Sequence, residues 1–248
     1  MPDHDPVGRD RRALLRAGAA LLGATLLPFG ARAQTNGGKM RIGVIGSGHI
    51  GGTIGGLWVK DGHEVLFSSR HPEELKDMVA ALGSRAQAGT VQQAIDGGQV
   101  LFIAVPYGAL PQIGQDYGAA LKGKIVLDAC NAVSARDGVP IADEVEQEGI
   151  GVVSQKYLSG ARLVRAFNTL NYKIFASEAN RPDPRLAVPI AGDDPEAVKV
   201  AAGLVRDAGF DAVVVGKLAD AKRFQRGAPG YGQAVNAAEL KQKLSLAP

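Results

Sequence analysis

The sequence predicts a doubly wound α/β fold, in which helices cover both faces of a mostly parallel sheet. Two observations support this prediction. Apolar runs of strand length alternate with stretches of helical length, which is the pattern of right-handed β–α–β crossovers. Several of these runs are apolar at nearly every position, as in strands that are buried on both faces. We expect one large domain, because no proline- or serine-rich linker and no internal repeat divides the chain.

The composition agrees with a globular protein and limits its partners. Hydrophobic residues make up 46% of the 248 residues, which is enough for a core and excludes disordered and fibrous classes. The formal charge is +3, and the first 33 residues hold five arginines against three aspartates. The remainder is close to neutral, so we expect no nucleic-acid partner. A single cysteine, Cys130, excludes an intramolecular disulfide and a cysteine-rich metal site.

Residues 1–33 are predicted to be a twin-arginine-type signal peptide. Arg11 and Arg12 precede a weakly apolar run over 17–30, and Ala31-Arg32-Ala33 has the small-x-small pattern of a cleavage site. The run is too short to span a bilayer, which needs about 20 residues. We therefore expect export to the periplasm as a folded protein and no membrane span in the mature chain. An uncleaved anchor or a disordered basic tail is the alternative.

The mature chain begins, after a short linker over 34–39, with a strand–turn–helix unit. Residues 40–45 form an apolar run rich in β-formers, and a glycine cluster leads from it into a helical stretch over 50–60. Asp61-Gly62-His63 is a turn signal, after which 64–67 is predicted to be the second strand. Pro72 suits the first turn of a helix that ends near Leu82.

Strands and caps then alternate along the rest of the chain. Thr90 can cap a short helix, and Asp194 with Pro195 predicts the start of another. Five further runs have the composition of strands: 99–105, 124–129, 163–167, 186–191 and 210–215. A last short helix is expected near 237–244. We assign residues 40–225 to one domain and 226–248 to a C-terminal loop and helix.

The glycine cluster has the spacing G-x-G-x-x-G. It follows the first predicted strand and opens the first predicted helix, which is the context of the dinucleotide-binding fingerprint of Rossmann folds. Its residues are Gly46, Ser47, Gly48, His49, Ile50 and Gly51. Gly46 permits the tight turn, Gly48 lets a pyrophosphate approach the backbone, and Gly51 lets helix and strand pack closely. A glycine-rich turn without a ligand is the alternative.

The end of the second strand indicates which dinucleotide is bound. NAD-type sites place a carboxylate there to bind the ribose 2′-hydroxyl. This chain has Ser68, Ser69 and Arg70 instead. Two hydroxyls and a guanidinium can bind a 2′-phosphate through charge-assisted hydrogen bonds, so NADP(H) is the predicted cofactor. Arg70 could otherwise be a solvated residue that opens a helix.

Two other strand ends carry candidate cofactor residues. Val105 and Pro106 end an apolar strand at the carboxyl edge of the sheet, where ligands of open α/β folds lie. Simple strand termination is the alternative for both. Asn168 and Thr169 follow a later strand, and their side chains could meet a nicotinamide carboxamide or cap the next helix.

General acid–base machinery is not recognisable in the sequence. None of the five tyrosines is followed four residues later by lysine, and none of the four histidines stands where a substrate acid is expected. No metal-ligand motif appears, so we predict no metal site. Cys130 follows an apolar strand and suits a core thiol better than a nucleophile. The catalytic residues stay unknown, and the pattern favours hydride transfer to a small-molecule acceptor that carries its own redox ring.

Taken in order, several blocks resemble the coenzyme F420-dependent NADP oxidoreductase family. The resemblance covers about residues 40–225 and includes the following blocks: 46–51, 68–70, 104–107, 123–128, 166–169 and 191–194. The same blocks are similar to the cytoplasmic NADPH-binding domain of the STEAP metalloreductases. The resemblance implies that the glycine loop, Ser69 and Arg70 bind NADPH, and that hydride passes directly to a flavin-like acceptor or to coenzyme F420.

Two other functions stay open from the sequence. One is a reductase of a small carbonyl, an imine or a metal chelate. The other is a non-catalytic module that binds NADP or a partner, which the missing acid–base residues favour. The oligomeric state is not specified, and a homodimer is one alternative.

Overall fold

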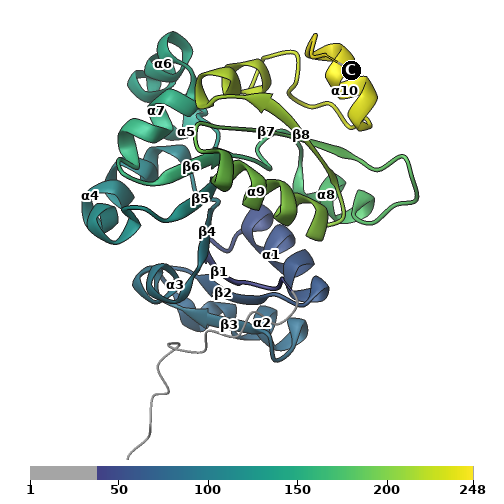
Figure 1. Ribbon diagram of the computed structural model, residues 1–248. Coiled ribbons are helices and arrows are strands. Elements are labelled where there is room, and N and C mark those ends of the chain that lie inside the picture. Colours follow the sequence, from purple (N-terminus) through teal and green to yellow (C-terminus); the bar gives the residue numbers. More distant parts are fainter. Residues whose placement is uncertain (1–37, 248) are drawn as a thin grey trace, which may run out of the picture. The chain divides into compact units, whose positions relative to one another are not determined.

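The computed structural model describes residues 38–247, and their strands form one eight-stranded sheet (Figure 1). The strand order is β3-β2-β1-β4-β5-β6-β7-β8. The strands are β1 Arg41–Ile45, β2 Glu64–Ser68, β3 Ala86–Gly89, β4 Val100–Ile103, β5 Ile125–Asp128, β6 Arg162–Arg165, β7 Ala187–Gly192 and β8 Asp211–Gly216. The order reverses beside β1, between β1 and β4, which is where doubly wound folds place their ligand crevice.

Helices connect these strands. The α-helices are α1 His49–Asp61, α2 Lys76–Leu82, α3 Val91–Gly97, α4 Leu110–Leu121, α5 Ser134–Asp137, α6 Val139–Glu148, α7 Ile150–Tyr157, α8 Tyr172–Glu178, α9 Pro195–Asp207 and α10 Ala237–Lys243. Three 3₁₀ helices lie at Pro72–Leu75, Tyr107–Ala109 and Leu218–Phe224.

Both faces of the sheet are covered, and each carries its own core. On one face, β-strand side chains pack against α1, α8 and α9, with Trp58 and Phe167 at the centre of an aromatic cluster. On the other face they pack against α3, α4, α6 and α7, together with α10 (Figure 1). Successive strand residues alternate between the two cores: Phe102 belongs to the first, and Leu101 and Ile103 belong to the second. The predicted doubly wound α/β fold is confirmed.

The sheet is parallel from β3 to β6, and β7 then enters antiparallel to β6, with Arg165 opposite Ala191. β8 pairs parallel with β7. The start of β7 therefore lies at the carboxyl edge of the other strands. This edge carries the ends of β1, β2, β4, β5 and β6, and it collects the residues considered below.

Capping residues in the sequence correctly predicted where several helices begin. Thr90 caps α3 through a capping box with Gln93, and Asp194 caps α9 with Pro195 in its first turn. The single helix expected after Pro72 is instead a 3₁₀ helix followed by α2. The final helix, α10, begins with a capping box between Asn236 and Glu239.

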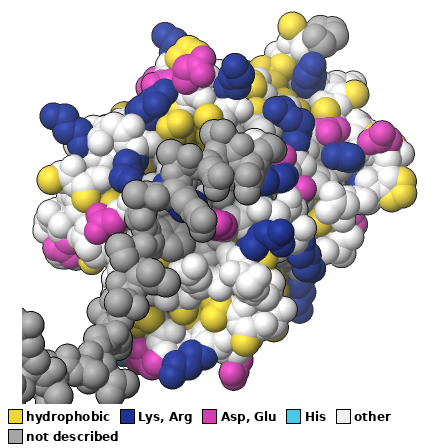
Figure 2. Space-filling model, turned by 60° about the horizontal axis from the view of Figure 1, so that its bottom comes forward, with side chains coloured by type: hydrophobic (Ala, Val, Ile, Leu, Met, Phe, Trp, Pro, Cys, Tyr) yellow, Lys and Arg dark blue, Asp and Glu magenta, His cyan; other side chains and the backbone are white. Residues whose placement is uncertain are grey.

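Within residues 38–247, no helix is long and apolar enough to cross a membrane. On the face shown in Figure 2, basic side chains stand at several separate places with acidic ones between them. The predicted signal peptide over 1–33 and most of the linker lie outside the described residues.

Candidate functional site

The glycine loop joins β1 to α1 in a conformation that only glycine permits at two positions. Gly46 has φ of +92°, and a Cβ there would lie 2.6 Å from the carbonyl oxygen of Ala104. A Cβ on Gly51 would lie 1.9 Å from the oxygen of Gly46. Gly48 differs, since a Cβ added there would meet nothing within 4 Å. It is the N-cap of α1 and brings no capping side chain, so the helix N-terminus faces open space that suits an anion.

The end of β2 is tied to this loop. The amide of Gly46 and the hydroxyl of Ser47 both donate to the carbonyl oxygen of Ser68, at 3.3 and 3.0 Å. The hydroxyl of Ser68 is buried and donates to the oxygen of Val44 at 2.8 Å, so this side chain points into the fold. Ser69 accepts a hydrogen bond from the amide of His71. Its neighbour Arg70 is exposed.

Arg70 makes no ion pair with any residue of the described chain. Together with Ser69 it stands beside the glycine loop, where a nucleotide ribose would lie. The described part of this strand end contains no carboxylate before Glu73, which pairs with His71 at 3.4 Å. The local charge therefore suits a 2′-phosphate better than a free 2′-hydroxyl.

The end of β4 lies over the glycine loop. A Cβ on Gly46 would lie 2.6 Å from a methyl carbon of Val105, so the Val105 side chain lies directly against this turn. Pro106 is exposed and begins the 3₁₀ helix that contains Tyr107. The buried Tyr107 hydroxyl donates to the oxygen of Ile150 at 3.1 Å. Burial raises the pKa of Tyr107, which suits a structural phenol.

A buried ion pair holds the ends of β5 and β6. Asp128 and Arg165 are both fully buried and in contact. Asp128 accepts from the amide of Cys130, and Arg165 donates to the Cys130 oxygen at 2.6 Å. The Cys130 thiol accepts from the amide of Val105 at 3.4 Å, and burial raises its pKa. Cys130 is thus a buried thiol that links two strand ends, and a raised pKa disfavours a nucleophilic thiolate.

Asn168 and Thr169 lie at the end of β6 and are 2% exposed. The preceding residue, Phe167, has φ of +60°, which is an uncommon conformation for a bulky side chain. Asn131 donates to the Asn168 carbonyl oxygen at 2.6 Å, which links the segments after β5 and β6. The Asn168 Oδ1 and Thr169 Oγ1 atoms are buried and have no hydrogen-bond partner in the structure. Such atoms are costly to leave unpaired, and they point to a bound polar group.

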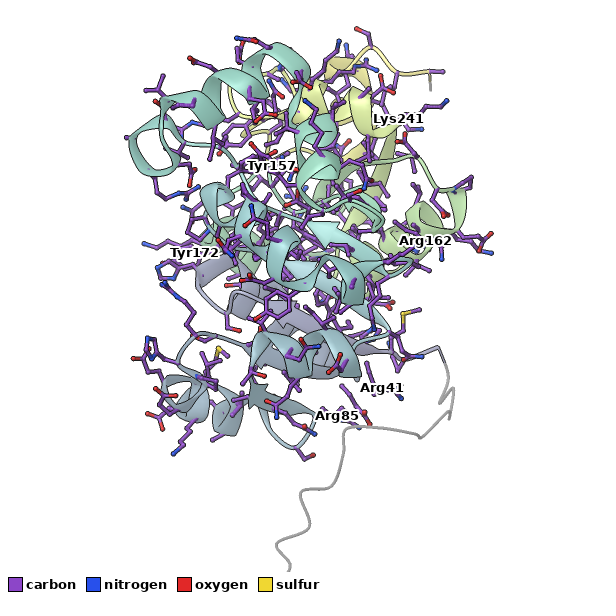
Figure 3. All side chains as sticks on the ribbon, turned by 90° about the vertical axis from the view of Figure 1, so that its left-hand side faces the viewer. Arg41, Arg85, Tyr157, Arg162, Tyr172 and Lys241 are labelled. Carbon is purple, nitrogen blue, oxygen red and sulfur yellow. The ribbon has the colours of Figure 1, made fainter. Side chains whose placement is uncertain are left out.

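One stacked pair joins the glycine loop to α8. The rings of His49 and Tyr172 lie 4.2 Å apart and are nearly parallel, at 7°. Tyr172, labelled in Figure 3, opens α8 only three residues after Thr169. The pair brings an imidazole and a phenol to the edge where the two halves of the sheet meet.

A pocket of about 680 Å³ adjoins the ends of β5 and β6. Its walls come from residues 132–135, from α6 and the start of α7, and from residues 225–231. The side-chain amide of Asn168 donates to the carbonyl oxygen of Phe224 at 3.3 Å. The backbone amide of Gly232 donates to the carbonyl oxygen of Thr169 at 2.9 Å. Both ends of the 225–231 wall are therefore bonded to the Asn168–Thr169 segment.

Among the described residues, one cluster has the composition of a metal site. Asp61, His63 and Asp207 offer ligand atoms within 4.8 Å of one another. However, the Nδ1 atom of His63 accepts from the amide of Met40 at 3.0 Å, so the neutral ring carries its proton on Nε2. That proton faces Asp207 at 3.0 Å, where a metal would need a lone pair. Lys39 pairs with Asp61 as well, and the cluster is a structural bridge between β1, α1 and α9.

Sequence reasoning missed four residues that the fold brings to this edge: Asp128, Asn131, Arg165 and Tyr172. The two buried charges had a signal, because each directly follows apolar strand residues. Asn131 and Tyr172 had none, since their partners lie 37 and 123 positions away in the chain.

The fold and the glycine loop are those of Rossmann-type domains. The profile of the family described as NADP oxidoreductase, coenzyme F420-dependent, matches residues 41–132. These residues are therefore similar to NADP-dependent oxidoreductases of that family. The matched segment runs from β1 to the residues just after β5.

Two curated proteins are similar to parts of this chain. Metalloreductase STEAP3 of Rattus norvegicus is 26% identical over 192 residues, which are 75% of this chain and 36% of STEAP3. The protein YjhV of Escherichia coli K12 is 44% identical over 63 residues, which are 25% of this chain and 46% of YjhV. The chain thus spans less than half the length of either relative.

Solved structures of low identity share the fold. The hypothetical protein SMa0349 of Sinorhizobium meliloti has a TM-score of 0.69 at 24% identity, over 80% of this chain and 95% of its own. A 3-hydroxyisobutyrate dehydrogenase of Mycobacterium tuberculosis has a TM-score of 0.54 at 17% identity, over 74% and 57%. These likenesses support the Rossmann-type fold alone.

Proposed function

We propose that this protein is an NADPH-dependent oxidoreductase that passes a hydride between NADP(H) and a flavin-like or deazaflavin ring such as coenzyme F420. One observation carries the proposal: at the carboxyl edge of the sheet, the buried Oδ1 of Asn168 and Oγ1 of Thr169 have no hydrogen-bond partner among residues 38–247. A polar, planar group such as a carboxamide would satisfy both atoms. The match of residues 41–132 to the profile of NADP oxidoreductases supports the choice of cofactor.

Residues at the carboxyl edge of the sheet fit each part of NADP(H). The pyrophosphate would lie over Gly48, against the N-terminus of α1, in the space that a Cβ would fill. Ser69 and Arg70 would bind the 2′-phosphate. Val105 and Pro106 would lie beside the nicotinamide ribose, as Val105 already lies against the glycine turn.

When bound, the nicotinamide would supply a hydride at C4. The chain's own contribution is positional. Arg165 and Asp128 hold the backbone of Cys130, and this fixes Asn131 against Asn168. A fixed carboxamide site keeps the ring plane constant, and orientation of this kind lowers a barrier without any proton transfer by a side chain.

A second candidate function is favoured by the His49–Tyr172 stack. A small carbonyl or imine needs a proton donor as well as a hydride, and this pair brings two candidate donors to the crevice edge. A ring acceptor takes its proton from water more readily, so it does not depend on the pair. The two functions therefore differ in their response to loss of the tyrosine hydroxyl.

The experiment follows deuterium from NADPH labelled separately on each face of C4. A deazaflavin is the acceptor, because hydrogen bound at its ring carbon does not exchange with water. We expect deuterium to appear on the deazaflavin from one face of NADPH only, and Tyr172→Phe to keep that rate within about threefold. Reduction of a carbonyl or imine that Tyr172→Phe lowers by about 10²–10⁴ would favour the second function. NADPH binding without reduction of any acceptor would contradict both and would indicate a binding module.

A further inference from the structure

The pocket beside the end of β6 is lined almost entirely by residues beyond 41–132, the segment that matches the family profile. Its volume of about 680 Å³ lies within the range of about 300–1,000 Å³ that suits ligands with fused rings and side chains. A small carbonyl or imine would leave most of this space to water. The pocket therefore has room for a larger ligand.

The pocket begins where the proposed nicotinamide site ends. Ala132 of its wall follows Asn131, and Gln225 follows Phe224. The Asn131 side chain donates to the Asn168 carbonyl oxygen, and the Asn168 side-chain amide donates to the Phe224 carbonyl oxygen. These bonds place the pocket next to Asn168, so a ring that receives hydride there could extend its remaining atoms toward the pocket.

The pocket has an apolar floor and polar walls. Val145 and Ile150 are buried and form part of the floor, while Tyr231 is half-buried and adds a ring. Gln225 is engaged, because its Oε1 atom accepts from the amide of Ile150 at 3.1 Å. An apolar floor of this kind suits the faces of a ring system.

Two charged residues in the lining form no ion pair within residues 38–247. Arg226, in the loop, and Glu146, on α6, are exposed and form no ion pair with each other or with another residue of the described range. An arginine in a pocket offers five hydrogen-bond donors to an anion, and a carboxylate accepts from N–H or hydroxyl donors. A ligand that complements both carries an anionic group and also neutral donors.

We propose that this pocket binds the non-reacting end of the hydride acceptor, and that Arg226 makes it selective for acceptors carrying a phosphate or carboxylate. This inference rests on the proposed function, since it assigns a subsite to the same reaction. Glu146 accepts from hydroxyl or N–H donors of the same molecule. The loop 225–231 is the specificity element, held at both ends by its bonds to Asn168 and Thr169.

The test uses FMN and riboflavin, which share ring and ribityl chain and differ only in the phosphate. Their binding is measured by flavin fluorescence with NADP⁺ saturating and at physiological ionic strength, so that no turnover is needed. We expect FMN to bind at least about tenfold more tightly than riboflavin to the unaltered protein, as one charge-assisted contact implies. Arg226→Ala should remove that preference and leave riboflavin within twofold.

Two further variants separate this inference from general effects of charge. Lys222→Ala removes an exposed cation four residues away that does not line the pocket, and it should change neither affinity. Glu146→Gln should affect FMN and riboflavin equally. Equal binding of the two flavins, no binding of either, or the same loss in Lys222→Ala as in Arg226→Ala would overturn the inference. The deuterium experiment with a deazaflavin judges the proposed function independently of these outcomes.

Discussion

At the scale of single residues, the three glycines of the fingerprint have different tasks. Gly46 and Gly51 are needed by the fold, because a Cβ at either would overlap backbone atoms. The fold does not need a glycine at position 48, since its surroundings are empty and its φ of −73° suits any residue. Under the proposed function, the bound pyrophosphate needs it. A sequence motif alone does not separate these tasks.

Replacing Gly48 by valine should therefore abolish NADP(H) binding and leave the fold intact. The valine side chain would occupy the space over the N-terminus of α1 where the pyrophosphate is proposed to lie. We expect the thermal midpoint to stay within about 3 °C, whereas Gly51→Val should destabilise by about 1–3 kcal/mol through overpacking. Calorimetric titration and thermal unfolding measure the two effects. NADP(H) binding by folded Gly48→Val would remove the glycine loop from the site.

At the scale of elements, the carboxylate of Asp194 links the N-terminus of α9 to β6. Asp194 accepts from the amides of Glu196 and Ala197, and Arg162 of β6 donates to it at 2.6 and 2.9 Å. The Arg162 guanidinium and these amides hold the pKa of Asp194 well below its ordinary value of 3.8. Both the cap of α9 and its contact with β6 thus depend on the ionised form of Asp194.

The lowered pKa gives this contact a defined pH dependence. Because the folded-state pKa is depressed, the stabilisation is fully present above about pH 4 and is lost as the pH falls through the folded-state value. Asp194→Asn should lower the urea midpoint at pH 7, and the difference from the unaltered protein should shrink in acid. Glu196→Gln, which removes a carboxylate two residues further along the chain, is the control. A difference that stays constant from pH 7 to pH 3 would show that charge is not involved.

The same elements show how far sequence reasoning reaches. Strands such as β4 and β5 were placed by their continuous apolar runs, and α3 and α9 by their capping residues. The antiparallel entry of β7 was not predicted, because its apolar pattern is the same in either direction. Likewise, the loop 225–231 was recognised as a loop, but its bonds to Asn168 and Thr169 are tertiary contacts without a local signal.

At the scale of the whole molecule, the ligand crevice depends on contacts between distant parts of the chain. Trp58 of α1 donates to the Leu204 oxygen of α9 at 2.8 Å, and the His49–Tyr172 stack joins the glycine loop to α8. These contacts fix the first β–α–β unit against the second half of the sheet. The proposed cofactor site consequently depends on the whole folded chain and not on the glycine loop alone.

Export of this folded chain remains a proposal, because residues 1–33 lie outside the described part. A receptor that reads the twin arginine would not accept lysine, whereas an electrostatic leader would. The double change Arg11→Lys and Arg12→Lys should therefore abolish the appearance of mature protein in the periplasm, as followed by immunoblotting of cell fractions. Undiminished export of the double variant, or a mature N-terminus far from Gln34, would contradict the proposal.

The central claim is that the carboxyl edge of the sheet holds NADP(H) in preference to NAD(H). Calorimetric titration of the unaltered protein and of Arg70→Ala with NADPH and NADH tests it most directly. The account predicts tight binding of NADPH, weaker binding of NADH, and a loss of about tenfold or more for NADPH alone in Arg70→Ala. Equal affinity of the unaltered protein for both dinucleotides, or equal loss of both in the variant, would contradict it.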